Sequence, residues 1–419
     1  MKRKVLALLL VTTMGCGLFG GCASTEEETN RGITAQEKAD DGVVDLTVWA
    51  DADSQVLMEE LVKGFQAKYG SQAKFNITLG VQGEADCRDV LLGDIKGAAD
   101  VFCFADDQLN SMIAGGALSP VPNAAEVSAA NTAESVEAST YKGTLYAYPM
   151  TADNGYFMYY NKNYFTEEDV ATFDGMLAVC EANGKKMTMD LSSGWYLYSF
   201  FGQTGMEMKL NPDGVTNFCN WNESGTVAGA DVAQAILDIC RRPGFLAGGD
   251  ADLVAGANND TVIAGVSGVW NAMAIKEAWG DDYGAVKLPT YTVAGQQIQM
   301  ASFTGFKMVG VNAYSEEVEW AHKFADYMTN EDSQNLRFAM RNQGPSNIKA
   351  AASEEVSKVP AILAVIDQSQ YGTLQRVGNS YWGACTDFSA TLVAGNPDGT
   401  LMQELMDVLV LGITETVAQ

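Results

Sequence analysis

Aromatic rings and carboxylates are the side chains of this sequence whose types and positions could bind a ligand. Most of them follow a predicted strand or occupy a predicted turn rather than the middle of an apolar stripe. Flat aromatic faces suit the C–H patches of pyranose rings, and carboxylates accept hydrogen bonds from paired hydroxyl groups, so the combination favours a carbohydrate cleft. The candidate ligand-binding residues are Trp49, Asp51, Phe104, Asp106, Asp107, Asp153, Trp195, Tyr196, Trp270 and Trp382.

Each candidate also has a purely structural interpretation. Plain core packing explains the aromatic residues as well, most readily Phe104 and Tyr196 and least readily Trp270. Asp51 and Asp53 precede an apolar helical pattern, where helix capping alone explains an acidic residue. We assign the remaining indole side chains, Trp221, Trp279 and Trp320, to the core or the surface.

Other kinds of site find less support. A glycosidase needs two carboxylates about 5 to 10 Å apart with one held protonated, and nothing singles out such a pair. A ferric-iron binder would use adjacent tyrosines, but Tyr159 and Tyr160 lie in a predicted strand, where neighbouring side chains face opposite ways. The single histidine, His322, lies in a charged helical run that looks like a surface, which disfavours a Ser-His-Asp or cysteine hydrolase.

Metal and disulfide chemistry are not indicated either. No C-x-x-C pair occurs, and the Asp-rich turn at 249–252 is typical of a solvated loop, so we expect no metal and no cofactor. The cysteines beyond Cys22 sit in apolar surroundings that favour buried free thiols, and we assign no disulfide. They are Cys87, Cys103, Cys180, Cys219, Cys240 and Cys385.

The N-terminus has the pattern of an export signal. A basic start is followed by an apolar run too short to span a membrane and then by small residues, which predicts a signal peptide at 1–21. The sequence LFGGC at 18–22 resembles a bacterial lipoprotein processing site, with Phe19 where Leu is usual, so Cys22 is the predicted lipidation site. Residues 22–44 are polar and acidic and indicate a flexible tether. We expect a lipid-anchored protein on the extracellular face of the cell membrane.

The charge of the chain limits its partners. The formal net charge is −27, and removing residues 1–21 leaves 23 basic and 53 acidic residues, or −30. An acidic body of this kind disfavours nucleic acid and anionic membrane surfaces as partners.

Strands and helices alternate in the first part of the chain. Strand patterns at 45–50, 75–79 and 100–104 are separated by helical patterns at 55–69 and 84–95. This order predicts an α/β fold with an open, largely parallel sheet, and ligands bind such sheets beyond the carboxyl ends of the strands. A second α/β region follows, with helices at 172–184 and 231–240 and strands at 187–191 and 261–266.

The stretch at 145–165, LYAYPMTADNGYFMYYNKNYF, alternates as a strand on both sides of a polar segment at 151–155. An Asp-Asn-Gly run suits a turn, so two strands joined by a kink are predicted. The kink is compatible with an ordinary hairpin or with a crossover between two lobes.

Several stretches in order resemble maltose-type extracellular solute-binding proteins of ABC importers. They are AADVFCFADDQLNSMIAGGALSPV at 98–121, YKGTLYAYPMTADNGYFMYYNK at 141–162, SGVWNAMA at 267–274, YGAVKLPTY at 283–291, SFTGFKMVGVNAYS at 302–315 and NSYW at 379–382. The resemblance implies a two-lobed, type II periplasmic-binding-protein-like fold with a hinge and discontinuous domains. The implied lobes are 45–152 with 300–330, and 153–299 with 331–419.

The same resemblance implies roles for particular residues. Trp270 and Trp382 match the stacking aromatics of the maltose-type cleft, and Trp195 stands where that family often has Tyr. Asp107 and Asp153 match its hydroxyl-binding acids. Asp106 and Gln108 depart from more basic residues of the maltose protein, which leaves the exact sugar open.

The implied function is a non-enzymatic substrate-binding lipoprotein of an ABC transporter, which captures an oligosaccharide and delivers it to a permease. Maltodextrins and other α-glucans are the leading class; another glycan or a cation such as a polyamine is the alternative, ahead of a secreted glycosidase. Basic residues are missing from the implied site, which disfavours anionic ligands. We expect a monomer.

Overall fold

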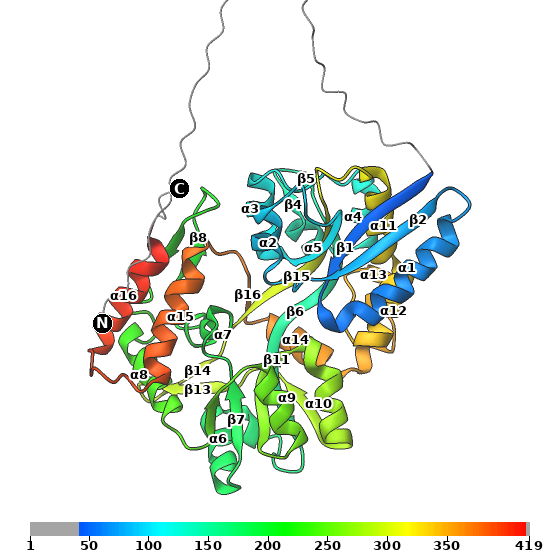
Figure 1. Cartoon of the computed structure of the whole chain (residues 1–419). Helices are drawn as coiled ribbons and strands as arrows, with labels where there is room; N and C mark the ends of the chain where they lie inside the picture. The colour runs from blue at the N-terminus through cyan, green and yellow to red at the C-terminus, as the bar shows by residue number, and fades with distance from the viewer. Residues whose placement is uncertain (1–41, 416–419) are drawn as a thin grey trace, which may run out of the picture. The chain divides into compact units, whose positions relative to one another are not determined.

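The computed structural model describes residues 42–415 (Figure 1). The predicted signal peptide, Cys22 and nearly all of the predicted tether lie outside the described residues. Within residues 42–415, no helix has both the length and the apolar character that crossing a membrane requires.

One mixed sheet forms the centre of the fold. Its strand order is β10-β7-β11-β6-β15-β3-β1-β2, with β12 paired to β6 and β16 to β15. The strands are β1 (Val43–Ala50), β2 (Lys74–Val81), β3 (Val101–Ala105), β6 (Tyr148–Asn161), β7 (Lys186–Met189), β10 (Phe245–Ala247), β11 (Val262–Gly268), β12 (Tyr283–Val286), β15 (Ser302–Val311) and β16 (Gly372–Leu374). The predicted α/β class is therefore present, although β6 runs antiparallel to β15, β11 and β12, and β15 runs antiparallel to β3.

The first lobe is built around β1, β2 and β3, which are parallel as predicted. Helix α1 (Gln55–Tyr69) buries Leu57, Leu61 and Phe65 at helical spacing against β1 and ends at Gly70. The other helices of this region are α2 (Cys87–Gly93), α3 (Leu109–Ala114), α4 (Ala124–Ala130), α5 (Ala133–Ala138), α11 (Val318–Thr329), α12 (Glu331–Arg341) and α13 (Ile348–Ala351), with 3-10 turns η1 (Ala52–Ser54) and η2 (Asp106–Gln108); β4 (Thr140–Tyr141) pairs with β5 (Thr144–Leu145).

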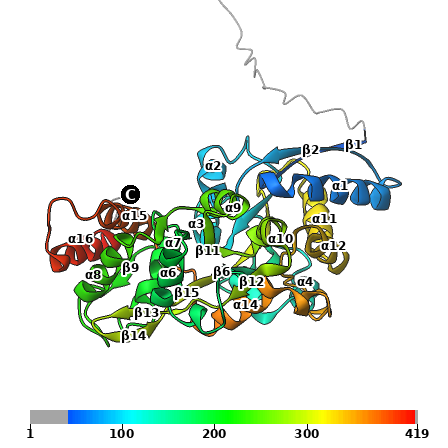
Figure 2. The same cartoon turned by 90° about the horizontal axis from the view of Figure 1, so that it is seen from below.

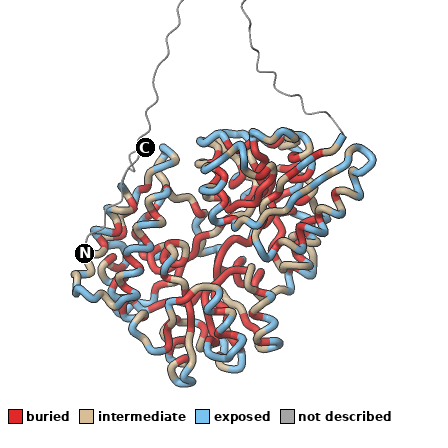
Figure 3. The backbone as a smooth tube through the Cα atoms, in the orientation of Figure 1, coloured by how far each residue is buried: buried red, intermediate tan, exposed pale blue. Residues whose placement is uncertain are grey.

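The second lobe is built around β7, β10, β11 and β12. Its helices are α6 (Phe173–Ala182), α7 (Gly194–Phe201), α8 (Gly229–Cys240), α9 (Asp250–Asn258), α10 (Ala272–Trp279), α14 (Pro360–Ser369), α15 (Ser380–Val393) and α16 (Met402–Thr414), with hairpins β8 (Met208–Leu210)–β9 (Asn217–Cys219) and β13 (Thr290–Val293)–β14 (Gln296–Gln299). The 3-10 turns are η3 (Asp169–Ala171), η4 (Val269–Asn271), η5 (Gly280–Asp282) and η6 (Val356–Lys358). Helix α16 packs on α15 and α8 (Figure 2). Buried residues follow the strands of both lobes (Figure 3).

Strand β6 belongs to both lobes. Its residues 148–155 pair with β15, and its residues 156–160 pair with β11. Of the two alternatives for 151–155, the hairpin is excluded and the crossover between lobes is observed. Strand β6 runs through this segment with its backbone paired on both sides: the amide of Ala152 donates to the carbonyl of Gly344 (2.9 Å) opposite β15. The pairing of β6 with β15 is nevertheless irregular: between Gly305 and Lys307, and again between Lys307 and Met308, β6 has one residue more than β15.

The side chains of β6 divide between two cores. Tyr156 and Met158 pack in one cluster with α6, α7 and α15, whereas Phe157 and Tyr159 pack in another with α9, α10 and α14. Tyr160 packs beside the first of these clusters, so Tyr159 and Tyr160 face opposite ways, as the alternation of a strand requires. The residue bounds given for the lobes stay a prediction; Leu336 and Met340 of α12 pack against the core of the first lobe.

Candidate ligand-binding site

The partly exposed Trp270 ring is held at its edge. Trp270 lies in η4, directly after β11, and its indole N–H donates to Asp250 at the start of α9 (2.7 Å). The hydroxyl of Ser267 donates to the other oxygen of the same carboxylate (2.6 Å). A Cβ on Gly268 would come within 2.0 Å of the ring, so this close approach requires glycine. The orientation of the indole is therefore fixed without blocking both of its faces.

Lys307 of β15 connects Trp270 to the first lobe. Its ammonium group lies 5.6 Å from the centroid of the Trp270 ring and 3.0 Å from the carboxylate of Glu84, which follows β2. Burial alone would lower the pKa of Lys307, but Glu84, Asp153 and Asp51 outweigh it and the pKa is raised. Burial raises the pKa of Glu84, against the opposing effect of Lys307. The lysine is thus charged and shared between the two lobes.

Asp51 and Asp153 lie around this lysine. Asp51 caps η1, with its carboxylate accepting from the backbone N–H of Ser54 (2.8 Å) and its hydroxyl (2.7 Å). Burial would raise the pKa of Asp51, but Ser54 and Lys307 lower it. Asp153 is buried in β6 and accepts from the backbone N–H of Gly344; burial raises its pKa.

A second acidic group lies at η2. Asp106 is fully buried and pairs with Arg376 (2.7 Å), while burial raises its pKa to about 6. Burial, together with the charge of Asp106, raises the pKa of Asp107 to about 7, although Gln375 opposes this. One carboxylate oxygen of Asp107 is buried without a hydrogen-bond partner. Such an oxygen would be satisfied by a hydroxyl donor of a ligand.

A third group is aromatic. Trp195, at the start of α7, stacks on Phe303 with the centroids 5.5 Å apart, and Trp382 of α15 lies 6.4 Å from the same ring. Both indoles are partly exposed. Phe303 is buried beneath them and packs on Tyr198 (4.1 Å), so the two tryptophans share a rigid support.

The remaining candidates have mainly packing roles. Phe104 is fully buried in the core of the first lobe, so neither face of its ring can contact a ligand and it does not belong to the site. Trp49 is partly exposed beside the same core. Tyr196 is buried and its ring packs on that of Tyr156, with the centroids 4.9 Å apart, so it has a packing role.

One expectation about charged residues is wrong. Basic residues are not missing from the site, since Lys307 and Arg376 lie within it. Each is paired to an acid of this chain, which leaves Asp51, Asp107 and Asp153 in excess. Lys307 could have been found from the sequence, because it is the one charged residue in the otherwise apolar segment FKMVGV. Glu84 was missed because the predicted helix begins at Glu84, three residues before α2 does.

His322 is buried rather than at the surface. Its two ring nitrogens lie 2.9 Å from the hydroxyl of Ser119 and 3.0 Å from that of Tyr148. Burial lowers its pKa to about 4. Both ring nitrogens of His322 face hydroxyl groups, whereas a Ser-His-Asp triad has a carboxylate at one of them. Among residues 42–415, no group of three or more His, Cys, Asp or Glu side chains is arranged to hold a metal ion.

Comparison with known proteins places the chain in a family. The profile of bacterial extracellular solute-binding proteins matches residues 60–364, and the chain belongs to this family. The galactooligosaccharide-binding protein of Bacillus subtilis (strain 168) is 24% identical over 345 residues, 78% of each chain. The maltooligosaccharide ABC transporter solute-binding lipoprotein of Streptococcus pneumoniae (strain R6) is 24% identical over 388 residues, 87% of this chain and 86% of the relative.

Solved structures agree with the fold. A structure described as being with acarbose superposes with a TM-score of 0.79 at 27% identity, covering 89% of this chain and 99% of the other. The maltodextrin binding protein MalE1 from L. casei BL23, without ligand, superposes with a TM-score of 0.74 at 24% identity, covering 89% and 100%. The predicted family and the predicted two-lobed α/β fold are both confirmed.

Proposed function

We propose that this solute-binding protein captures an extracellular oligosaccharide, with maltodextrins and other α-glucans first, and delivers it to the permease of an ABC importer. The observation that carries the proposal is the Trp270 network: an indole fixed by Asp250 and Gly268 beside a lysine that the first lobe holds. Trp195, Trp382 and the unpartnered oxygen of Asp107 add two ring platforms and a hydroxyl acceptor. Relatives named for maltooligosaccharide and galactooligosaccharide binding support the class of ligand.

The mechanism is a population shift about the crossing strands. Strands β6 and β15 are the connections on which the two lobes would bend. A sugar that stacks on Trp270 and binds acids of the first lobe contacts both lobes together only when they are close. Its greater affinity for that arrangement makes the closed form dominant, and the permease recognises the closed form.

The protein acts as a non-enzymatic monomer without cofactor. Lipidation at Cys22 would keep it at the extracellular face of the membrane. The extracellular family and a lipoprotein among the relatives support this location. Intact oligosaccharide after long incubation with the protein would agree with pure binding, whereas cleavage products would identify a glycosidase.

Two alternative classes of ligand are each supported by one observation. The Bacillus subtilis relative makes a galactooligosaccharide the nearest alternative glycan. The excess of acids over Lys307 and Arg376 makes a cation such as a polyamine the alternative of another kind.

The test is a calorimetric titration of the chain from Ala23 onward against a ligand panel. We expect saturable heat with maltotriose that is lost in Trp270→Ala. Binding of a galactooligosaccharide or a xylo-oligosaccharide alone would keep the carbohydrate cleft but exclude an α-glucan as its ligand. Binding of spermidine that is lost in Trp270→Ala, with no binding of any sugar, would overturn the carbohydrate proposal.

A further inference from the structure

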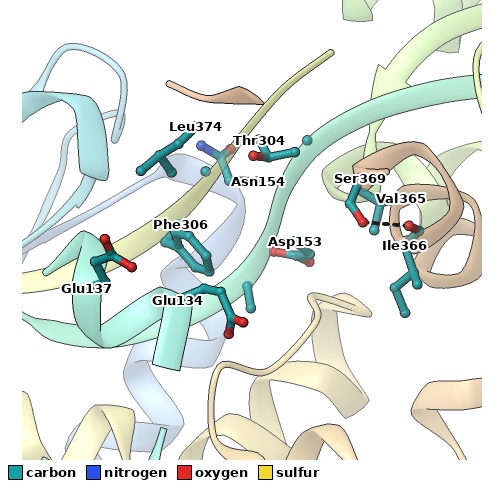
Figure 4. Close-up of a pocket in the computed structure, with 13 residues that line it drawn as sticks. Glu134, Glu137, Asp153, Asn154, Thr304, Phe306, Val365, Ile366, Ser369 and Leu374 are labelled. Carbon is teal, nitrogen blue, oxygen red and sulfur yellow. Dashed lines mark hydrogen bonds between the residues drawn. The ribbon is translucent and has the colours of Figure 1, made fainter. Parts of the chain in front are cut away.

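A pocket of about 400 Å³ lies on the crossing strands, apart from the tryptophans of the sugar site. Its floor is formed by residues 152–155 of β6 and 304–306 of β15. One wall comes from α5 and carries Glu134 and Glu137, and the other comes from α14 and carries Val365 and Ile366 (Figure 4). Helix α5 packs on the first lobe and α14 on the second, so the pocket has a wall from each lobe.

The two glutamates face the pocket with free carboxylates. They lie three residues apart on one helix, which places both on the same face. Both are exposed, and in the described part of the chain neither forms an ion pair or a side-chain hydrogen bond. Their negative potential is not neutralised within the pocket, because its other lining residues include no lysine or arginine.

Asn154 is an independent sign of a missing ligand. Its residue is only 8% exposed, and it lines the pocket from β6. Within residues 42–415, its side-chain amide forms no hydrogen bond, so the amide is free to bind a ligand that enters the pocket. Asp153, its neighbour, is already satisfied by the backbone N–H of Gly344. The free carbonyl oxygen of the Asn154 amide could accept a hydrogen bond from a ligand.

Much of the remaining lining is apolar, although Asp153, Thr304 and Ser369 also line the pocket. Phe306, Val365 and Leu374 supply hydrocarbon surface between the glutamates and the far wall. An acidic rim, an apolar body and a buried acceptor together fit an aliphatic compound with two ammonium groups. One ammonium would bind Glu134 and Glu137, the methylene chain would cover Phe306, and the second would reach Asn154.

We propose that this pocket binds an aliphatic diamine and that its occupancy is coupled to sugar affinity. A compound seated between α5 and α14 stabilises the lobe arrangement in which both walls contact it. Since hinge bending changes the separation of those walls, the diamine and the sugar must alter each other's affinity by the same factor. The pocket adjoins the sugar site of the proposed function at Asp153, but Glu134, Glu137 and Asn154 are not among the sugar-site candidates.

The test uses cadaverine as the probe in calorimetry on the same chain. We expect saturable heat that weakens with added salt, and none with 1,5-pentanediol or glutarate, which keep the length and change the charge. The double variant Glu134→Gln/Glu137→Gln should lower the affinity at least about tenfold. The matched variant Glu126→Gln/Glu404→Gln, with two exposed glutamates outside the pocket, should not change it.

Two further arms separate this proposal from the sugar site. Trp270→Ala should leave cadaverine binding unchanged, and Asn154→Ala should weaken it. Saturating cadaverine should change the affinity for maltotriose by a measurable factor. The pocket assignment would be overturned by any of four results: no heat with cadaverine, equal binding of 1,5-pentanediol, an unchanged affinity in Glu134→Gln/Glu137→Gln, or loss of cadaverine binding in Trp270→Ala. An unchanged affinity for maltotriose in saturating cadaverine would overturn the coupling.

Discussion

At the scale of residues, the account depends on one tryptophan and the groups that orient it. The indole N–H of Trp270 is bonded to Asp250, and Ser267 bonds the other oxygen of that carboxylate. A ring fixed before the ligand arrives loses less conformational entropy on binding than a mobile one. Asp250 therefore acts on the ligand through Trp270 and is a positioning residue.

The variant Asp250→Asn tests this positioning role. An amide keeps the size of the side chain but replaces two charged acceptors with one neutral acceptor, so one of the two donors loses its bond. We expect an affinity for maltotriose about tenfold lower, with thermal stability nearly unchanged. Calorimetry on Asp252→Asn provides the control, because this exposed acid lies two residues further along α9 and accepts from the backbone N–H of Gly249 (3.1 Å) rather than from Trp270. Equal affinities in the two variants would contradict the role of Asp250.

The buried carboxylate of Asp107 gives a prediction about pH. Burial raises its pKa to about 7 in the fold, so the native state binds more protons than the unfolded chain between about pH 4 and pH 7. The stability therefore falls as pH rises through that window. Asp107→Asn removes the titrating group, and it should be more stable than the parent chain at pH 8 by at least about 1 kcal/mol, with the difference vanishing below about pH 4.

Denaturant unfolding at several pH values measures this difference. A stability gap that stays constant from pH 4 to pH 8 would show that the carboxylate of Asp107 is not held in an unfavourable environment.

At the scale of elements, the pairing of β6 with β15 carries the hinge. A Cβ atom at Gly305 would lie 2.6 Å from the side chain of Asp106 and 3.1 Å from that of Asn154. The space beside Gly305 is therefore too small for any side chain. Sequence patterns indicated a break in β6, because Asp-Asn-Gly is typical of turns. The backbone of Gly344 pairs with β6 on its other edge, and that long-range contact overrides the local preference.

Two glycine variants test the tightness of this crossing. Gly305→Ala should destabilise the fold by about 1–3 kcal/mol, because Asp106 would have to move away from Arg376. Gly383→Ala, in the exposed interior of α15 with no atom near its added Cβ, should stabilise the fold by about 0.5–1 kcal/mol. Thermal or urea unfolding measures both. Similar effects of the two changes would show that the crossing is looser than described.

At the scale of the whole molecule, order and periodicity predicted much of the architecture. The β1-α1-β2-α2-β3 series and the second α/β region follow from strand and helix patterns, and the two-lobed fold follows from the resemblance of ordered stretches to a family. Phe104, Lys307 and His322 were misjudged because their environments depend on partners far along the chain. Glu84 contacts Lys307 across 223 positions, and Ser119 contacts His322 across 203.

The central claim is that an oligosaccharide binds against Trp270. The most direct measurement is calorimetric titration of maltotriose into the parent chain, Trp270→Ala and Trp320→Ala. Trp320 is a matched control, since it is also a partly exposed indole beside a lysine, with the ammonium group of Lys323 at 4.0 Å. We predict saturable binding to the parent and Trp320→Ala and a loss of at least about tenfold in Trp270→Ala. Equal affinity in all three proteins, or no binding to the parent, would contradict the account.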